Sequence, residues 1–234
     1  MLSKTKQKEY LRKKNGEWQL HLHAFAGSRD PEALHQLRVS LKKLKAVARF
    51  SKACAGTKAL KDFDQLNKMF RQAGLIRDAG KTQQQQLEAA ETEKFLRKIE
   101  QYRRNGKRAG RRVIADVRSV TSDSIRDWYA IQLITTGILL TGSSDELHKA
   151  RKQIKSLLYV EKLLPPPIRE SLSLDRKYLD DLQEAIGQWH DAAMMVAAWA
   201  GKDHKDSEAM THDCREKETA VRHLAADFYL HAHC

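Results

Sequence analysis

Five side chains that can donate hydrogen bonds to phosphate recur at helical spacing in the first quarter of the chain. They are His35, Arg38, Lys42, Lys45 and Arg49, at positions i, i+3, i+7, i+10 and i+14. On an α-helix this spacing places all five on one face, over roughly 21 Å at about 1.5 Å per residue. A row of guanidinium, ammonium and imidazole donors suits a chain of phosphates better than one compact anion.

The same stretch contains no Asp or Glu between Leu34 and Lys52. Exposed helices normally carry i,i+4 pairs of opposite charge, and cations without such partners repel one another. An ordinary solvated face is the alternative interpretation of the row, and the absence of acid argues against it. We therefore expect the row to bind an anion.

A leucine stripe one residue away indicates how the basic row is positioned. It consists of Leu34, Leu37, Leu41 and Leu44. Its spacing is that of a bundle face, and one residue corresponds to about 100° around a helix. The cations should therefore line the border of the core, with their stems packed and their charged heads projecting. Asp30 and Pro31 are suited to start this helix, as N-cap and first-turn residue.

An internal repeat at an offset of 113 residues organises the rest of the chain. Residues 35–42 align with 148–155, and 74–79 align with 187–192 without a change of offset. The aligned pairs include His35 with His148, Arg38 with Arg151, Lys42 with Lys155 and Arg77 with His190. Two separated patches at one offset indicate a duplication of a helical unit, and two copies do not make a solenoid.

The two histidines and the two aspartates of the repeat have competing interpretations. A lone helical histidine is more often a packing residue than a ligand. His35 and His148 each stand three residues before an arginine, which also fits donation to phosphate. Asp78 and Asp191 follow glycines at the same spacing, and we expect them to cap or orient a neighbouring helix.

The remaining pattern predicts an all-α protein. Only 4 prolines and 11 glycines interrupt 234 residues, and no alternating strand pattern stands out. The expected helices cover about 3–25, 31–53, 57–78, 124–140, 144–163, 171–190, 191–201 and 206–231, with further helical sequence up to about 119. We predict one domain over 1–234, made of two pseudo-twofold-related four-helix bundles, 1–120 and 121–234.

Charge is unevenly distributed along the chain. The formal net charge is +13 and the pI is near 9.7, which implies an anionic partner. The first 118 residues hold 29 of the 43 Lys and Arg residues, and the remainder is net acidic. Further cations gather between Arg97 and Arg112. We expect Arg104 and Arg108 to extend the basic surface, while a solvated face explains about half of this cluster.

The cysteines and the apolar runs indicate the cellular compartment in which we expect the protein. Cys54, Cys214 and Cys234 lack metal-ligand spacing, which suits a reducing environment. The most apolar run, 128–140, is too short to span a bilayer and is predicted to be a buried helix. No apolar signal-peptide core follows the N-terminus. We expect a cytoplasmic protein.

Catalytic motifs are not apparent. The chain has no glycine-rich phosphate loop and no G-x-S-x-G elbow. His190 and Asp191 superficially resemble half of a metal-dependent phosphohydrolase site, but no second helix offers a matching pair. His231, His233 and Cys234 could chelate a metal, although terminal residues commonly fray. We predict no catalytic residue, no metal site and no cofactor.

These residues resemble the CHAD domain, the conserved histidine α-helical domain. The resemblance rests on His35-x-x-Arg38-x-x-x-Lys42-Lys43-Leu44-Lys45, on Gly74-x-x-Arg77-Asp78-Ala79 and on their second-copy counterparts, and it covers about 5–231. It implies two four-helix bundles with a basic groove between them, binding of inorganic polyphosphate and association with polyphosphate granules. Carried over position by position, it implies the ligand residues His35, Arg38, Lys42, Lys45, Arg77, His148, Arg151, Lys155 and His190.

The second copy departs from this pattern, so the two copies are not expected to bind the ligand equally. Ser156 stands at the position of Lys43, and Leu158 at that of Lys45. We therefore expect the first half to dominate affinity. RNA is the competing partner, since the basic composition also fits nucleic acid, but the basic row holds no aromatic residue for stacking on bases. A phosphohydrolase is a third and weaker interpretation.

Overall fold

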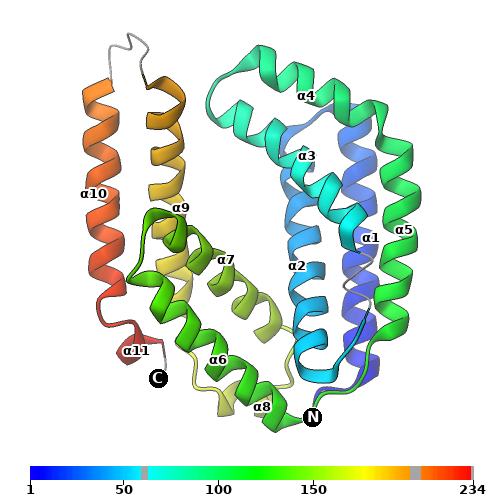
Figure 1. Ribbon diagram of the computed structural model, residues 1–234. Coiled ribbons are helices and arrows are strands. Elements are labelled where there is room, and N and C mark those ends of the chain that lie inside the picture. The colour runs from blue at the N-terminus through cyan, green and yellow to red at the C-terminus, as the bar shows by residue number, and fades with distance from the viewer. Residues whose placement is uncertain (59–62, 201–206, 233–234) are drawn as a thin grey trace. The chain divides into compact units, whose positions relative to one another are not determined.

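The computed structural model describes residues 1–58, 63–200 and 207–232, and its helices are drawn in Figure 1. Within these ranges every regular element is a helix. An isolated antiparallel β-bridge joins Leu2 and Val120. The all-α prediction is confirmed. The chain divides into two compact units, Met1–Ile125 and Arg126–Cys234.

The first unit is built mainly from five helices, and a sixth begins at its end. They are α1 (Lys4–Ser28), α2 (Pro31–Ala55), α3 (Asp64–Lys81), α4 (Gln85–Arg97), α5 (Ile99–Asp116) and the start of α6 (Ser122–Leu140). Helices α1 and α3 each pack against both α2 and α5, while α4 packs chiefly against α3. Helices α2 and α5 therefore occupy opposite corners of a four-helix arrangement.

Helix α2 forms as its sequence predicts. The side chain of Asp30 accepts hydrogen bonds from the backbone N–H groups of Glu32 and Ala33, at 3.0 and 3.2 Å. Pro31 occupies the first turn, where its missing N–H costs no helical hydrogen bond. The leucine stripe is buried in the core, with no member more than 3 % exposed. Burial of such side chains contributes about 1.5–3 kcal/mol each to folding.

The second unit contains most of α6 and the remaining helices. They are α7 (Ser144–Glu161), α8 (Pro166–Ser171), α9 (Arg176–Trp199), α10 (Ser207–Ala225) and α11 (Phe228–His231). Helices α7 and α10 both pack against α9. The buried stripe of α7 is Leu147, Ala150, Ile154 and Leu157, each 0 % exposed. These four positions are those of the leucine stripe of α2, shifted by 113 residues.

Three predicted helix boundaries were wrong. No break separates 171–190 from 191–201, because the sequence between Arg176 and Trp199 contains no proline, and α9 is continuous. The helix expected from residue 57 is α3, which starts at Asp64, and residues 59–62 lie outside the described ranges. The helix expected over 206–231 is divided into α10 and α11.

Helix α6 is buried on one face only, although its apolar sequence predicted a buried helix. Tyr129 and Leu133 face the core, with exposures of 1 and 3 %. Ile131, Ile134 and Ile138, on the opposite face, are between 55 and 62 % exposed. None of the helices in the described ranges combines the length and apolar character needed to cross a membrane.

Candidate anion-binding sites

Cations from two helices of the first unit come together where α2 packs against α3. We call this cluster the first basic site and define it by His35, Arg38, Lys42 and Lys45 of α2 and Arg77 of α3. The charges of Arg38, Lys42 and Arg77 all act on the imidazole of His35. The structure therefore gathers these sequence-predicted residues into one local electrostatic environment.

Arg38 is the buried member of the first basic site. Its side chain is 8 % exposed, its Nη1 donates to the backbone carbonyl of Phe70 at 2.8 Å, and its guanidinium carbon lies 4.3 Å from the Phe70 ring centroid. A Cβ added at Gly74 would lie 2.5 Å from Nη1, so a larger residue at this position would force the guanidinium to shift. Burial, and secondarily the charge of Arg77, lower the pKa of Arg38 to about 10, while Asp78 opposes the shift.

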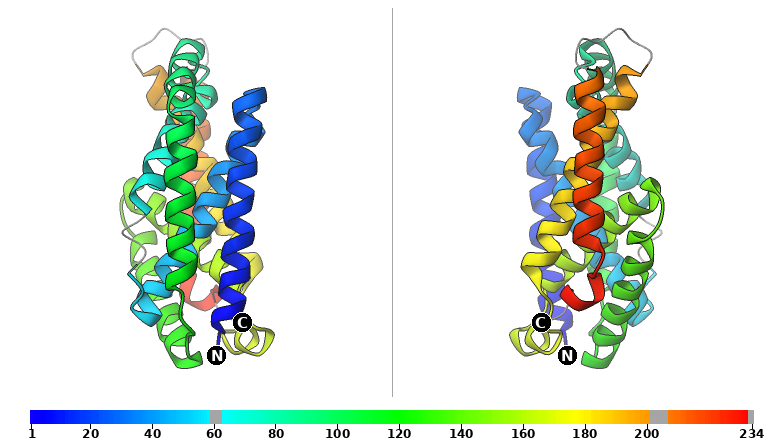
Figure 2. Two further views of the ribbon diagram at one scale, coloured as in Figure 1. Left: turned by 90° about the vertical axis from the view of Figure 1, so that its right-hand side faces the viewer. Right: turned by 90° about the vertical axis from the view of Figure 1, so that its left-hand side faces the viewer.

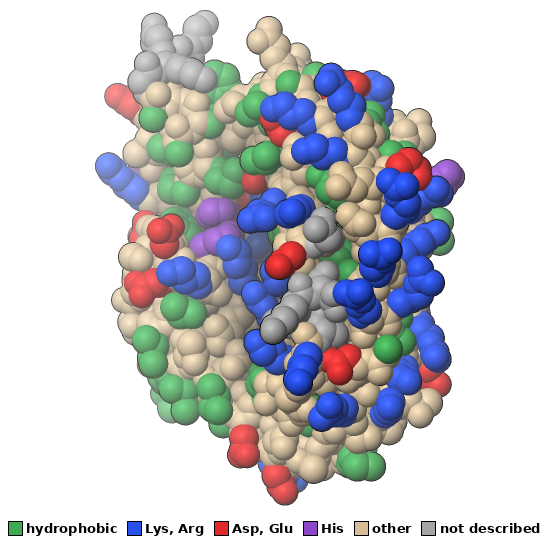
Figure 3. Space-filling model, turned by 45° about the vertical axis from the view of Figure 1, so that its right-hand side comes forward, with side chains coloured by type: hydrophobic (Ala, Val, Ile, Leu, Met, Phe, Trp, Pro, Cys, Tyr) green, Lys and Arg blue, Asp and Glu red, His purple; other side chains and the backbone are tan. Residues whose placement is uncertain are grey.

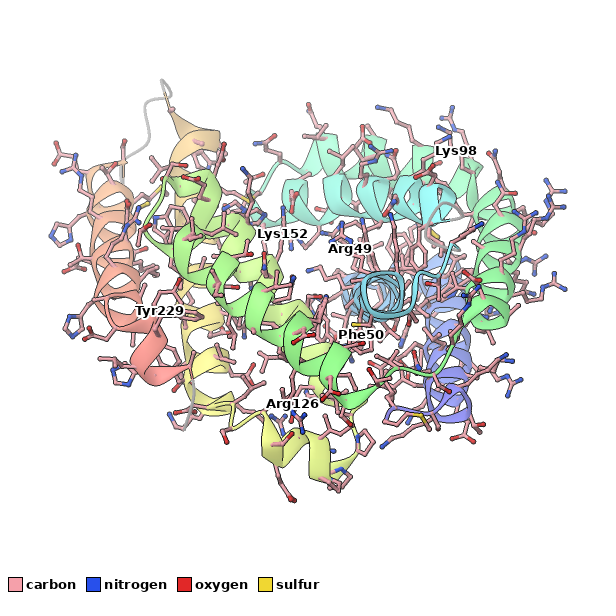
Figure 4. All side chains as sticks on the ribbon, turned by 60° about the horizontal axis from the view of Figure 1, so that its bottom comes forward. Arg49, Phe50, Lys98, Arg126, Lys152 and Tyr229 are labelled. Carbon is pink, nitrogen blue, oxygen red and sulfur yellow. The ribbon has the colours of Figure 1, made fainter. Side chains whose placement is uncertain are left out.

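The prediction that every charged head of the basic row projects outward was wrong for Arg38. The heads of the two lysines are half-buried beside α3. Lys45 donates from Nζ to Oδ1 of Asn67 at 2.7 Å, and Nζ of Lys42 lies 5.9 Å from the Phe70 ring centroid. Arg49 is exposed, and no described carboxylate forms an ion pair with it. Figure 4 shows Arg49 leaving α2 on a different side from the buried Phe50.

The protonation of His35 depends on its burial and on the charged groups around it. Its pKa is lowered, chiefly by burial. Glu32 opposes this shift, and the cations Lys42, Arg77 and Arg38 reinforce it. The imidazole is therefore biased toward its neutral form. An anion placed beside these cations would reverse the bias and favour uptake of a proton.

Arg77 is held by its neighbour in α3. Its Nε donates to Oδ1 of Asp78 at 2.7 Å, and its Nη2 also contacts that oxygen. Asp78 therefore orients an arginine within its own helix, where a cap for a neighbouring helix was expected. The guanidinium is directed by this contact while a quarter of the Arg77 side chain stays exposed.

Two hollows flank the first basic site. A small cavity of about 30 Å³, room for roughly one water molecule, is lined by residues that include Lys42, Lys45 and Phe70. A larger pocket of about 350 Å³ is lined by Arg77 and Lys81, among other residues. Arg77 thus borders both the row of α2 and this larger pocket, so a linear anion could continue past it.

The second unit builds a corresponding cluster between α7 and α9. We call it the second basic site and define it by His148, Arg151, Lys155 and His190. Arg151 donates from Nε to the backbone carbonyl of Gln183 at 2.9 Å. A Cβ added at Gly187 would lie 2.5 Å from Nη2 of Arg151. An arginine, a carbonyl and a glycine thus meet in both units at positions 113 residues apart.

The polar groups around the two arginines differ between the units. Lys155 donates from Nζ to Oε1 of Gln183 at 2.9 Å, where Lys42 faces an aromatic ring. Burial, followed by the charge of Arg151, lowers the pKa of Lys155. The imidazoles of His148 and His190 stack with centroids 4.0 Å apart. The duplication itself stays a prediction from the sequence, and these contacts agree with its residue pairing.

Arg104 and Arg108 are not brought into the first basic site. Both are exposed on α5, which occupies the corner of the first unit opposite α2. Sequence reasoning also missed Asn67, Phe70 and Gln183, which contact the lysines and arginines. Phe70 and Gln183 stand at the 113-residue offset, so a longer alignment of the repeat would have paired them.

A metal centre finds no support among the described residues. Within residues 1–58, 63–200 and 207–232, no three His, Cys, Asp or Glu side chains gather closely enough to hold a metal ion. His233 and Cys234, named above as possible ligands, lie outside these ranges.

The fold and the two sites together define an all-helical protein in which an arginine contacts a backbone carbonyl and a glycine, within a basic cluster, at one helix pair of each unit. The family model of the CHAD domain matches residues 9–121 and 79–200. The chain belongs to the CHAD domain family.

A solved structure supports the same fold. The crystal structure of the CHAD domain from the plant Ricinus communis is similar with a TM-score of 0.68, over 96 % of this chain and 91 % of that chain. The sequence identity is 16 %, so the likeness concerns the fold alone. The sequence has no match among curated proteins.

Proposed function

We propose that this chain is a binding module for inorganic polyphosphate and that the first basic site is its principal contact surface. The observation that carries the proposal is that Arg38 and Lys42, from a segment of α2 without acidic residues, both lie against Phe70 of α3, the helix that also carries Arg77. Membership of the CHAD family supports polyphosphate as the polyanion, since the family resemblance implies that ligand.

The site offers two kinds of positive charge that suit a phosphate chain. Arg38 is fixed and largely desolvated, and electrostatic attraction is stronger where water is excluded. Lys42, Lys45 and Arg49 continue along α2 for roughly 10 Å at about 1.5 Å per residue. A linear anion lying along α2 would meet these groups in succession, with Arg77 on its other side.

Charge reversal provides the direct test. The double variant Lys42→Glu/Arg77→Glu should weaken polyphosphate binding at least about tenfold, because each removed cation also removes released counterions. The matched control is Lys149→Glu/Lys152→Glu, which makes the same charge change on an exposed part of α7. Circular dichroism establishes that both variants fold. Equal losses in the two variants would contradict a localised site.

Nucleic acid is the competing candidate for the anionic ligand. The guanidinium of Arg38 lies 4.3 Å from the centroid of the Phe70 ring and so competes with a base for stacking on that ring. A competition assay with polyphosphate, single-stranded RNA and duplex DNA at equal phosphate concentration separates these ligands. RNA displacing polyphosphate would reverse the ranking.

We further propose that the chain does not itself hydrolyse its ligand and that it acts in the cytoplasm at polyphosphate granules. Incubation with polyphosphate and Mg²⁺ or Mn²⁺ should release no phosphate above a protein-free control. Phosphate release that depends on His190 and Asp191 would establish hydrolysis. A fluorescent fusion should colocalise with polyphosphate granules, and the Lys42→Glu/Arg77→Glu form should be diffuse.

A further inference from the structure

A second collection of cations covers the exposed face of α5. Figure 3 shows Lys and Arg side chains gathered toward the right, the side on which α5 lies in Figure 1. The exposed cations of α5 are Arg103, Arg104, Lys107, Arg108, Arg111 and Arg112. The opposite side of the helix, which includes Tyr102, Ala109 and Val113, is buried.

Acidic side chains do little to balance this charge. Glu100 pairs with Arg103 at 2.7 Å, and Asp116 accepts the backbone N–H of Lys58 at 2.5 Å. Arg112 also has an interaction of its own. We call the other four cations the α5 basic face: Arg104, Lys107, Arg108 and Arg111. Among the described residues, none offers these four an ion pair or hydrogen bond. An ordinary solvated helix intersperses acids among its cations, and no acidic residue lies between Arg104 and Arg111.

The packing of α5 directs this face away from the bundle. A Cβ added at Gly106 would lie 2.5 Å from the Trp18 ring of α1 and 3.1 Å from Leu66 of α3, so Gly106 marks the inward side. Arg104 and Arg108 each lie two residues from Gly106, about 200° around the helix. Figure 2 shows α1 and α5 side by side, with the outer side of α5 uncovered within the first unit.

We propose that the α5 basic face is a second polyphosphate-contacting surface, so that one molecule engages two chains or two distant parts of one long chain. This proposal rests on the proposed function. The face contains four cations within about 10 Å of helix. It presents no aromatic side chain, since Tyr102 is 7 % exposed, which favours a ligand made of phosphates without bases.

The distance between the first basic site and the α5 basic face determines which polyphosphate lengths can contact both. Axes of neighbouring helices in a bundle lie about 8–10 Å apart, and α2 and α5 occupy opposite corners. A short oligophosphate on the first basic site cannot also reach the α5 basic face. Long chains can, and a protein with two such contacts gains affinity through effective concentration and cross-links chains.

The test isolates the α5 basic face in a protein whose first basic site is already disabled. In the Lys42→Glu/Arg77→Glu background, adding Arg104→Glu/Arg108→Glu should reduce the remaining long-chain affinity at least about tenfold at low salt. The matched control adds Lys149→Glu/Arg215→Glu, which reverses two exposed cations of the second unit. The control should keep the remaining affinity within about twofold.

Light scattering gives an independent readout of cross-linking. Wild type mixed with long polyphosphate should scatter strongly, and Arg104→Glu/Arg108→Glu alone should scatter at least about fivefold less while binding short oligophosphate with wild-type affinity. Scattering equal to wild type, or an equal fall in the control, would overturn the inference. So would a loss confined to RNA binding. If wild type binds no polyphosphate at all, the proposed function fails first.

Discussion

The two basic sites share one contact between their helices and differ in the side chains that surround it. In both units an arginine reaches from one helix to a backbone carbonyl of the helix packed against it and lies against a glycine, a contact we call the arginine–glycine clasp. Its members are Arg38, Phe70 and Gly74 in the first unit and Arg151, Gln183 and Gly187 in the second. The clasp holds a helix pair together in each unit.

The positions around the clasp distinguish the two units. Where the first unit has Lys45, the second has Leu158, which is 5 % exposed and belongs to the core. Where the first has Arg77 bound by an aspartate, the second has His190 stacked on His148. The comparison teaches that the arginine of the clasp supports architecture in both units, although Arg38 is buried and Arg151 is only half-buried, while its neighbours decide how much charge reaches an anion.

The largest expected effect comes from removing charge from each site in turn. Lys42→Glu/Arg77→Glu should weaken long-chain polyphosphate binding by about 100-fold, and the aligned pair Lys155→Glu/His190→Glu by less than about fivefold. The reason is that the second site holds fewer permanent cations. Isothermal titration at fixed salt measures both. Equal losses would show that the two units contribute alike and would end the asymmetric account.

The next effect concerns the clasp and separates architecture from binding. Gly74→Ala and Gly187→Ala should each lower the free energy of unfolding by about 1–3 kcal/mol, because the new Cβ overlaps the guanidinium and forces repacking. Thermal and denaturant unfolding measure this loss. A double variant with the arginine shortened to alanine should recover part of the Gly74→Ala penalty. Full stability in Gly74→Ala would mean that the helices do not meet as described.

A smaller effect follows from the lowered pKa of His35. Because the free-protein pKa lies below its unfolded value, protonation opposes folding as pH falls below about 6.5, in the absence of an anion. Bound phosphate raises that pKa, so affinity should increase severalfold from about pH 8 to about pH 6. Titration at several pH values checks this. His35→Gln should flatten the slope, and an unchanged slope would exclude His35.

The smallest expected effect adds charge to the weaker site. Ser156 is half-buried and stands at the position of Lys43 in the repeat. Ser156→Lys should raise polyphosphate affinity by about twofold, and Thr219→Lys, at an exposed position of α10, should raise it less. Competition against labelled polyphosphate resolves such differences. A larger gain from the control variant would show that net charge, and not position, governs affinity.

The helix faces could be predicted from the sequence because they follow a period of 3.6 residues. The buried stripe of α2 and the helical row from His35 to Arg49 were both assigned correctly. The continuous α9 was not, because His190 and Asp191 were read as a boundary although neither residue breaks a helix. Length and the absence of proline were the better guides there.

The sequence predicted which residues belong to the first basic site better than it predicted how they are placed. The depth of Arg38 depends on Gly74 in another helix and on the carbonyl of Phe70, an acceptor that every residue type carries. Both partners belong to α3, so a helical wheel drawn for α2 alone does not show them. The separation of Arg104 from the first basic site likewise depends on α5 packing against α1 and α3, which charge patterning does not encode.

Calorimetric titration of wild type and Lys42→Glu/Arg77→Glu with polyphosphates of defined length tests the central claim most directly. We predict that wild-type affinity rises with length while the row from His35 to Arg49 is being covered, and that the variant loses most of this gain. A further rise is expected only for chains long enough to reach the α5 basic face as well. A wild type that binds no polyphosphate, or a variant that follows the same length dependence as wild type, would contradict the account.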